Sequence, residues 1–128
     1  MILGIGIDIV DNRRIKKTLE RFGDKFKFKC FLSDEISRSD NLYNNYNSYA
    51  KRFAAKEACA KALGTGLSKA VFWKDIEIMN NEYGKPSIKL HNKAITLLNK
   101  ITKKEFYIAL SLSDERNYSI ANVIIYEN

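Results

Sequence analysis

The chain has 128 residues, of which 45% are hydrophobic and 29% charged, and this suits one compact domain covering residues 1–128 with a modest core. It contains no apolar run near the length of a membrane span and no basic leader with a cleavage site, so we expect a cytoplasmic protein without a membrane partner. The excess of 22 Lys and Arg over 15 Asp and Glu favours an anionic partner: a nucleic acid, an acidic protein or a phosphorylated metabolite. A compositional bias toward Lys, Asn and Ile explains the charge equally well.

The first predicted strand contains GIGIDIV, residues 4–10, in which Gly4, Gly6 and Asp8 alternate with isoleucines. Successive side chains of a strand point to opposite faces, so the isoleucines form one face and the glycines and Asp8 the other. We expect the isoleucine face to be the core face, and the glycine face to be a surface that a ligand approaches closely. On these residues alone, close packing of a helix against the glycines explains them slightly better than the approach of a ligand does.

Two helices are expected next. Asp11 is a suitable N-cap for the first, whose apolar positions Ile15 and Leu19 follow helical spacing. The opposite side of this helix is basic and carries Arg13, Arg14, Lys16, Lys17 and Arg21. Ser33 is followed by two acidic residues, which favour a helix start, and this short helix should end near Asn41.

Residues 43–63 predict the longest helix, which ends at Gly64 and carries small residues on two sides that allow close packing against a sheet. Glu57 and Lys61 lie one turn apart on it, within RFAAKEACAKALGTG, residues 52–66. Such a pair is usually a solvated ion pair, by roughly four to one. Here the helix is alanine-rich and predicted to be buried on two sides, so a carboxylate within it needs a partner or a metal ion.

The remainder is rich in strands. Residues 71–79 and 85–90 predict a hairpin around NNEYG, and residues 91–101 predict a helix that starts at His91, which we expect to have a surface role. A closing hairpin follows, with strands on either side of DERN, residues 114–117. We expect one face of this hairpin to carry small residues that admit a helix or a neighbouring subunit: Ala109, Ser111, Ser113, Ser119, Ala121 and Val123.

Five motifs occur together in order: GIGIDIV, RFAAKEACAKALGTG, WKDIEI, YGKPSI and the SLSD of the closing hairpin. In this combination the chain resembles the small-type 4′-phosphopantetheinyl transferases over nearly its whole length. The resemblance implies an α+β domain with an antiparallel sheet packed on a long central helix, and a homotrimer with coenzyme A bound between neighbouring subunits. It also implies a Mg²⁺-dependent step of fatty acid biosynthesis, in which 4′-phosphopantetheine moves from coenzyme A to a serine of an acidic acyl carrier protein and adenosine 3′,5′-bisphosphate is released.

The resemblance also implies roles for individual residues. Asp8 and Glu57 are similar to the magnesium ligands, Lys61 to a pyrophosphate contact and Arg14 to a residue that docks the carrier protein. The docking face extends to Arg13, Lys17 and Arg21. Residues on motifs that line the coenzyme A site are Arg52, Lys56, Lys61, Gly64, Gly66, Lys85 and Pro86. Asp8, Glu57 and Lys61 form the expected catalytic set, since phosphoryl transfer needs alignment, charge neutralisation and a base, and Glu57 is the candidate base, directly or through a metal-bound water. In this interpretation the glycine face beside Asp8 leaves room for the pyrophosphate.

One position departs from the family pattern. The chain has Ser111, Leu112, Ser113 and Asp114 where Ser-x-Ser/Thr-His is expected, and an acid beside a phosphate is unfavourable. Two alternatives follow from the sequence. A non-catalytic module that binds nucleic acid would use the basic helix, but it leaves Asp8 and Glu57 unexplained, and no aromatic residues alternate with the basic ones in a stacking pattern. A pseudoenzyme that only binds carrier protein is suggested by Asp114 alone.

Overall fold

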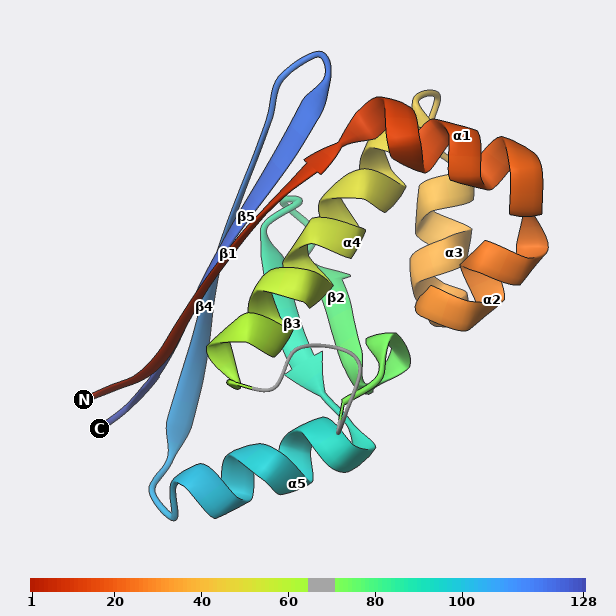
Figure 1. Ribbon diagram of the computed structural model, residues 1–128. Helices are drawn as coiled ribbons and strands as arrows, with labels where there is room; N and C mark the ends of the chain where they lie inside the picture. The colour runs from red at the N-terminus through yellow and green to blue at the C-terminus, as the bar shows by residue number, and fades with distance from the viewer. Residues whose placement is uncertain (65–70) are drawn as a thin grey trace.

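The computed structural model describes residues 1–64 and 71–128, and Figure 1 shows how their helices and strands are arranged. In chain order the elements are β1 (Ile2–Asp11), α1 (Asn12–Phe22), α2 (Asp24–Cys30), α3 (Ser33–Asp40), α4 (Asn45–Ala62), the 3₁₀ turn η1 (Trp73–Asp75), β2 (Ile76–Asn80), β3 (Pro86–Leu90), α5 (Asn92–Ile101), β4 (Phe106–Asp114) and β5 (Tyr118–Glu127). In the described part of the chain, no helix is both long and apolar enough to span a membrane.

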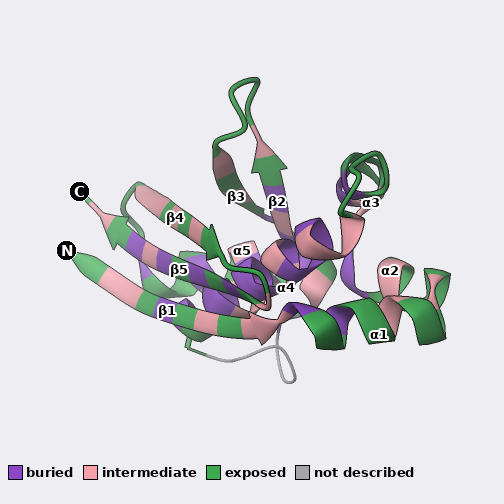
Figure 2. Ribbon diagram, turned by 90° about the horizontal axis from the view of Figure 1, so that it is seen from above, coloured by how far each residue is buried: buried purple, intermediate pink, exposed green. Residues whose placement is uncertain are grey.

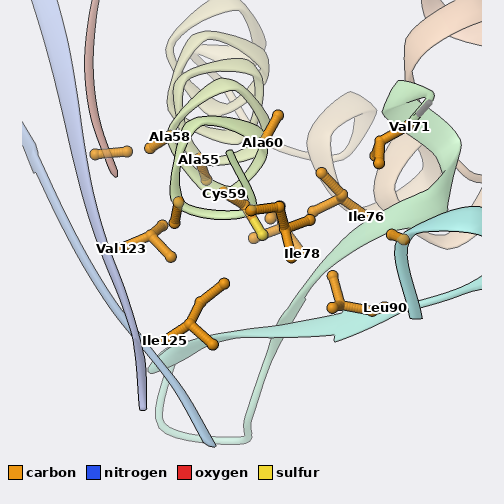
Figure 3. Close-up of a cluster of buried hydrophobic side chains, with 14 of the residues drawn as sticks. Ala55, Ala58, Cys59, Ala60, Val71, Ile76, Ile78, Leu90, Val123 and Ile125 are labelled. Atoms are coloured by element: carbon orange, nitrogen blue, oxygen red, sulfur yellow. The ribbon is translucent and has the colours of Figure 1, made fainter. Parts of the chain in front are cut away.

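Helix α4 is the centre of the domain. A three-stranded antiparallel sheet of order β1-β5-β4 covers one side of it, and the β2–β3 hairpin lies on another side (Figure 1). The alanines of α4 are fully buried and let both layers approach closely; Ala58 and Cys59 pack with Ile76 of β2 and with Val123 and Ile125 of β5 (Figure 3). The expected α+β fold, with an antiparallel sheet on a long central helix, is therefore confirmed.

The two faces of β1 are the reverse of the prediction. Gly4 and Gly6 face α4, and a Cβ at either position would collide with a backbone carbonyl of that helix, at Ala62 and Ala58 respectively. Ile5, Ile7 and Ile9 instead remain exposed, at 61%, 60% and 61%. Figure 2 shows exposed bands along β1. The expected isoleucine core face was wrong, and so was the idea that the glycines leave room for a pyrophosphate. The glycines admit a helix, and this is the other explanation that the sequence allowed.

The predicted N-cap of α1 is confirmed. Asp11 caps α1, because its Oδ1 accepts a hydrogen bond of 2.9 Å from the backbone N–H of Arg13. Arg13 also pairs with this carboxylate through its guanidinium, which lowers the pKa of Asp11 to about 2. Gly23, with φ of 51°, ends α1 and separates it from α2.

Two predictions for the strands need correction. The segment predicted as a strand from residue 71 first forms η1, because the Asp75 side chain accepts from the N–H of Phe72 and closes a turn before β2 begins at Ile76. In the closing hairpin, Leu110 pairs with Val123 and the expected face of small residues does not exist. The small residues of β5 share the inner face with the leucines of β4, and the small residues of β4 lie on the outer face.

Candidate functional site

Strand β1 and helix α4 bring Asp8 and Lys61 together. The ammonium of Lys61 donates to Asp8 Oδ1 at 3.0 Å and to the carbonyl oxygen of Ile7 at 3.0 Å. Asp8 pairs in register with Ala121 of β5, on the sheet face that α4 covers, and this places its carboxylate beside the helix. Glu57 lies one turn before Lys61 on the same side of α4. These three residues are called the acidic cluster below.

The electrostatics of the acidic cluster centre on Glu57. Burial raises the pKa of this half-buried carboxyl group, and the negative charge of Asp8 raises it further. The indole N–H of Trp73 and the ammonium of Lys61 lower the pKa and oppose these effects. Two carboxylates that repel each other favour a cation beside them, and Lys61 balances only one of the two charges.

The acidic cluster fits Mg²⁺, which prefers oxygen ligands and is commonly held by one or two carboxylates with phosphate oxygens and waters. Asp8 and Glu57 are the residues that would hold it. Over residues 1–64 and 71–128, no group of three or more His, Cys, Asp or Glu side chains is placed to hold a metal ion. A magnesium ion here would therefore depend on its substrate for further ligands.

A separate cavity of about 700 Å³ lies between α4, the β2–β3 hairpin and the end of β4. Arg52, Pro86 and Asp114 line it together with Arg38, Ser48 and Lys51. Arg52 precedes Glu57 by five residues, which turns its side chain by about 140° around the helix. It donates to the carbonyl oxygen of Ile78 and, at 2.6 Å, to Oδ1 of Asn80, both on β2. The residues predicted from the sequence thus fall into two groups on different sides of α4, the acidic cluster and this cavity, which is called the basic cavity below.

The prediction that Lys56 lines a ligand site needs correction. Its side chain is completely buried, and its ammonium donates to Glu35 Oε1 at 2.8 Å and to the carbonyl oxygens of Trp73 and Ile76. Burial lowers the pKa of Lys56, and the Glu35 carboxylate opposes this shift. Lys56 therefore has a structural role, joining α3, α4 and η1, and no free donor reaches a ligand.

Other predicted contacts have different outcomes. Gly64 follows α4 with φ of 88°, a left-handed conformation suited to glycine at a helix end. Gly66 lies outside the described residues. Lys85 is exposed on the β2–β3 turn, where its backbone N–H donates to Asn81, and it does not line the basic cavity. His91 Nε2 lies 2.8 Å from Glu77 Oε1, away from the acidic cluster.

The sequence missed the partner of Asp114. Lys51 Nζ lies 3.9 Å from Asp114 Oδ1 at the wall of the basic cavity, so the acid that departs from the family pattern faces a cation. These residues are 63 positions apart and only the fold brings them together. The available signal was the Lys51-Arg52 pair itself, two cations in an otherwise alanine-rich helix.

The basic side of α1 is exposed at Arg14, Lys17 and Arg21, next to the exposed ring of Phe22. Arg13 differs from them, because its guanidinium forms the pair with Asp11 and also lies 5.7 Å from the ring centre of Tyr118. Three of the four cations predicted to dock a partner therefore have no acidic partner among the described residues.

Comparisons with known proteins agree with this arrangement. A family model described as the 4′-phosphopantetheinyl transferase superfamily matches residues 4–122, and the chain belongs to this superfamily. Within it, the chain is 49% identical over 127 residues to the holo-[acyl-carrier-protein] synthase of Phenylobacterium zucineum, covering 98% of this chain and 92% of that protein. The resemblance inferred from the motifs is confirmed.

Solved structures of the same kind share the fold. The holo-[acyl-carrier-protein] synthase from Neisseria meningitidis superposes with a TM-score of 0.86 at 35% identity, covering 99% of this chain and 100% of that one. The holo-[acyl-carrier-protein] synthase from Helicobacter pylori, solved in complex with coenzyme A, gives a TM-score of 0.83 at 33% identity, with coverages of 95% and 99%. A close relative of this fold therefore binds coenzyme A.

Proposed function

We propose that the chain transfers 4′-phosphopantetheine from coenzyme A to a serine of an acyl carrier protein and releases adenosine 3′,5′-bisphosphate. The observation that carries this function is the acidic cluster of Asp8, Glu57 and Lys61 in a chain that matches the transferase superfamily over residues 4–122. The comparisons give no support to the alternative of a nucleic-acid-binding module.

The acidic cluster suits the chemistry of this transfer. Attack by the serine oxygen forms a bond to the β-phosphorus of coenzyme A, and the bond to the leaving bisphosphate breaks. Lys61 neutralises charge on the phosphate oxygens, and Glu57 accepts the serine proton, directly or through a water. Mg²⁺ held by Asp8 and Glu57 would supply further positive charge for the pyrophosphate.

A transfer assay tests the function directly. Apo acyl carrier protein, coenzyme A and Mg²⁺ are incubated with the chain, and the carrier is weighed by mass spectrometry. We expect a gain of one phosphopantetheine, which disappears when the acceptor serine of the carrier is replaced by alanine. Binding of the carrier without a mass gain would indicate the pseudoenzyme alternative instead.

The active unit is proposed to be a homotrimer with sites between subunits. The acidic cluster lies at β1 and the basic cavity includes the end of β4, and these strands are opposite edges of the sheet with β5 between them. The two groups therefore lie on different sides of α4 in the same chain. A neighbouring subunit that packs on the exposed isoleucines of β1 would bring its own basic cavity to the acidic cluster, and such exposed apolar faces commonly mark association surfaces.

The carrier protein is proposed to dock on the basic side of α1. Arg14→Glu is expected to slow association with the acidic carrier and to weaken binding, more at low salt than at high salt, because ions screen such attraction. Surface plasmon resonance at two salt concentrations measures both effects. The matched control is Lys104→Glu, which changes the net charge equally at an exposed site after α5. Equal losses in the two variants would contradict a specific docking face.

Lys51 is proposed to bind a phosphate of coenzyme A in the basic cavity while Asp114 holds it in place. Lys51→Met is expected to weaken coenzyme A binding several-fold, about 1 kcal/mol, because the cation is lost and Asp114 then repels phosphate. Asp114→Asn added to Lys51→Met should recover part of the affinity. Calorimetry measures both variants against Lys89→Met, an exposed site on β3. An unchanged affinity in Lys51→Met would remove this residue from the site.

A further inference from the structure

Trp73 is the single tryptophan of the chain and it lies in η1, against α4. Its ring stacks on Phe53 of α4, with ring centroids 6.0 Å apart and an angle of 25° between the planes. Lys29 Nζ lies 5.6 Å from the centre of the same ring. The carbonyl oxygen of Trp73 accepts a hydrogen bond of 2.9 Å from the buried Lys56. Both the backbone and the ring of Trp73 are thus held in place.

The indole nitrogen of Trp73 is buried, and within the described part of the chain it has no hydrogen-bond partner. A buried donor without a partner costs about 1–3 kcal/mol, so its retention calls for a reason. Phe53, on which the ring stacks, precedes Glu57 by four residues and occupies the same side of α4. The ring of Trp73 therefore lies on the side of α4 that carries Glu57, with its buried donor free to reach that carboxyl group.

The carboxylate of Glu57 is in turn an acceptor that lacks a hydrogen-bond donor. The ammonium of Lys61, one turn away on α4, donates to Asp8 and to the carbonyl oxygen of Ile7, and the described residues form no hydrogen bond or ion pair with the Glu57 side chain. Carboxylates that ligate metals are usually held by a second hydrogen bond that fixes their orientation, and losing this partner typically costs about 10- to 100-fold in metal affinity or activity. A long Glu side chain with several rotatable bonds needs such a restraint to serve as a ligand or a base.

We propose that Trp73 is a positioning residue for Glu57: its indole N–H donates to one carboxylate oxygen and leaves the other oxygen toward Asp8. The inference rests on the proposed role of Glu57 in the transfer. It gives the unpaired indole donor a function and explains why η1 is anchored to the buried Lys56. Trp73 does not touch the substrates in this arrangement, and it acts only through Glu57.

The contact itself is tested by NMR, which does not depend on activity. With ¹⁵N-labelled tryptophan, the chain gives a single indole N–H resonance, so its assignment is unambiguous. We expect this resonance to lie downfield in the wild type relative to Glu57→Ala, and to exchange more slowly with solvent. Mg²⁺ and coenzyme A should move it in the wild type but not in Glu57→Ala. A resonance that Glu57→Ala leaves unchanged would overturn the proposal.

Kinetics test the consequence. Trp73→Phe keeps an aromatic ring for the stack and removes the N–H. The Mg²⁺ concentration that gives half the maximal rate should then rise on the order of 10-fold. The KM for coenzyme A should stay unchanged. Lys29→Met is the control, because it removes the cation beside the ring and leaves the N–H, and its Mg²⁺ dependence should stay that of the wild type. An unaltered Mg²⁺ dependence in Trp73→Phe would contradict the positioning role. If the wild type transferred nothing, the proposed function would fail while the NMR result still decided the contact.

Discussion

Replacing Glu57 with glutamine is expected to lower kcat/KM for phosphopantetheine transfer on the order of 10³-fold, the scale seen when a general base or an electrostatic group is removed. The change preserves the size of the side chain and removes only its charge and basicity. Because the carboxyl group of Glu57 is half-buried and close to Asp8, water cannot supply the charge or the basicity that the substitution removes. The fold should survive, since the substitution also relieves the repulsion between the two carboxylates. The rate with saturating carrier protein is compared at several Mg²⁺ concentrations, with unfolding followed by circular dichroism.

The control is Glu105→Gln, an equal change of charge at an exposed residue before β4. It should leave the rate unaltered. If the rate of the Glu57→Gln variant returned fully at high Mg²⁺, the role of Glu57 would be only to bind the metal ion, and Glu57 would not be the base. A variant with the wild-type rate at all concentrations would remove Glu57 from the reaction altogether.

The acidic cluster was predicted from the family resemblance, and two local periodicities are consistent with it. The alternation of β1 places Asp8 on the glycine face, and the helical repeat places Glu57 and Lys61 one turn apart. What the sequence did not fix is which face of β1 meets the core. Leu3 and the three isoleucines that alternate with Gly4, Gly6 and Asp8 suggest a core face by hydrophobicity. Helix α4 nevertheless approaches so closely that only glycine fits at Gly4 and Gly6. A steric limit set by Ala58 and Ala62, more than 50 residues further along the chain, decided the outcome.

Two features that were missed from the sequence, the burial of Lys56 and the pairing of Lys51 with Asp114, share one cause. Lys56 lies within a motif of cations and small residues, and nothing nearby in sequence indicates that its ammonium is buried; its partner Glu35 is on α3. An unpaired buried ammonium would cost several kcal/mol, so the burial depends on this carboxylate and on two backbone carbonyls. Lys51 and Asp114 likewise meet only after β4 is placed beside α4. Local patterns predict elements and their faces, but ion pairs between distant elements need the tertiary structure.

Ile5→Asp is expected to prevent assembly of the proposed trimer and to abolish most of the transfer activity, while the separate chain remains folded. Ile5 is 61% exposed in the single chain, so a charge there costs little in the monomer. In an interface between copies the same carboxylate would be buried without a partner, at a cost of several kcal/mol in each contact. Sedimentation measures the assembly and circular dichroism the fold. Ile101→Asp, at an exposed position at the end of α5, is the control and should remain a trimer. A monomeric but fully active Ile5→Asp enzyme would show that one chain carries a complete site.

Mixing two inactive variants tests the proposed shared site without disrupting the proposed trimer. Glu57→Gln disables the acidic cluster, and Lys51→Trp replaces a cation at the wall of the basic cavity with a bulky ring that fills it. If each site combines the acidic cluster of one subunit with the basic cavity of its neighbour, random mixed trimers contain intact sites, because both halves then come from unmutated surfaces. About a quarter of all sites, or half of one times half of the other, should recover in the closed ring of three subunits. If one chain held the whole site, every subunit in the mixture would carry one defect, and unfolding and reassembling the two variants together would restore no activity.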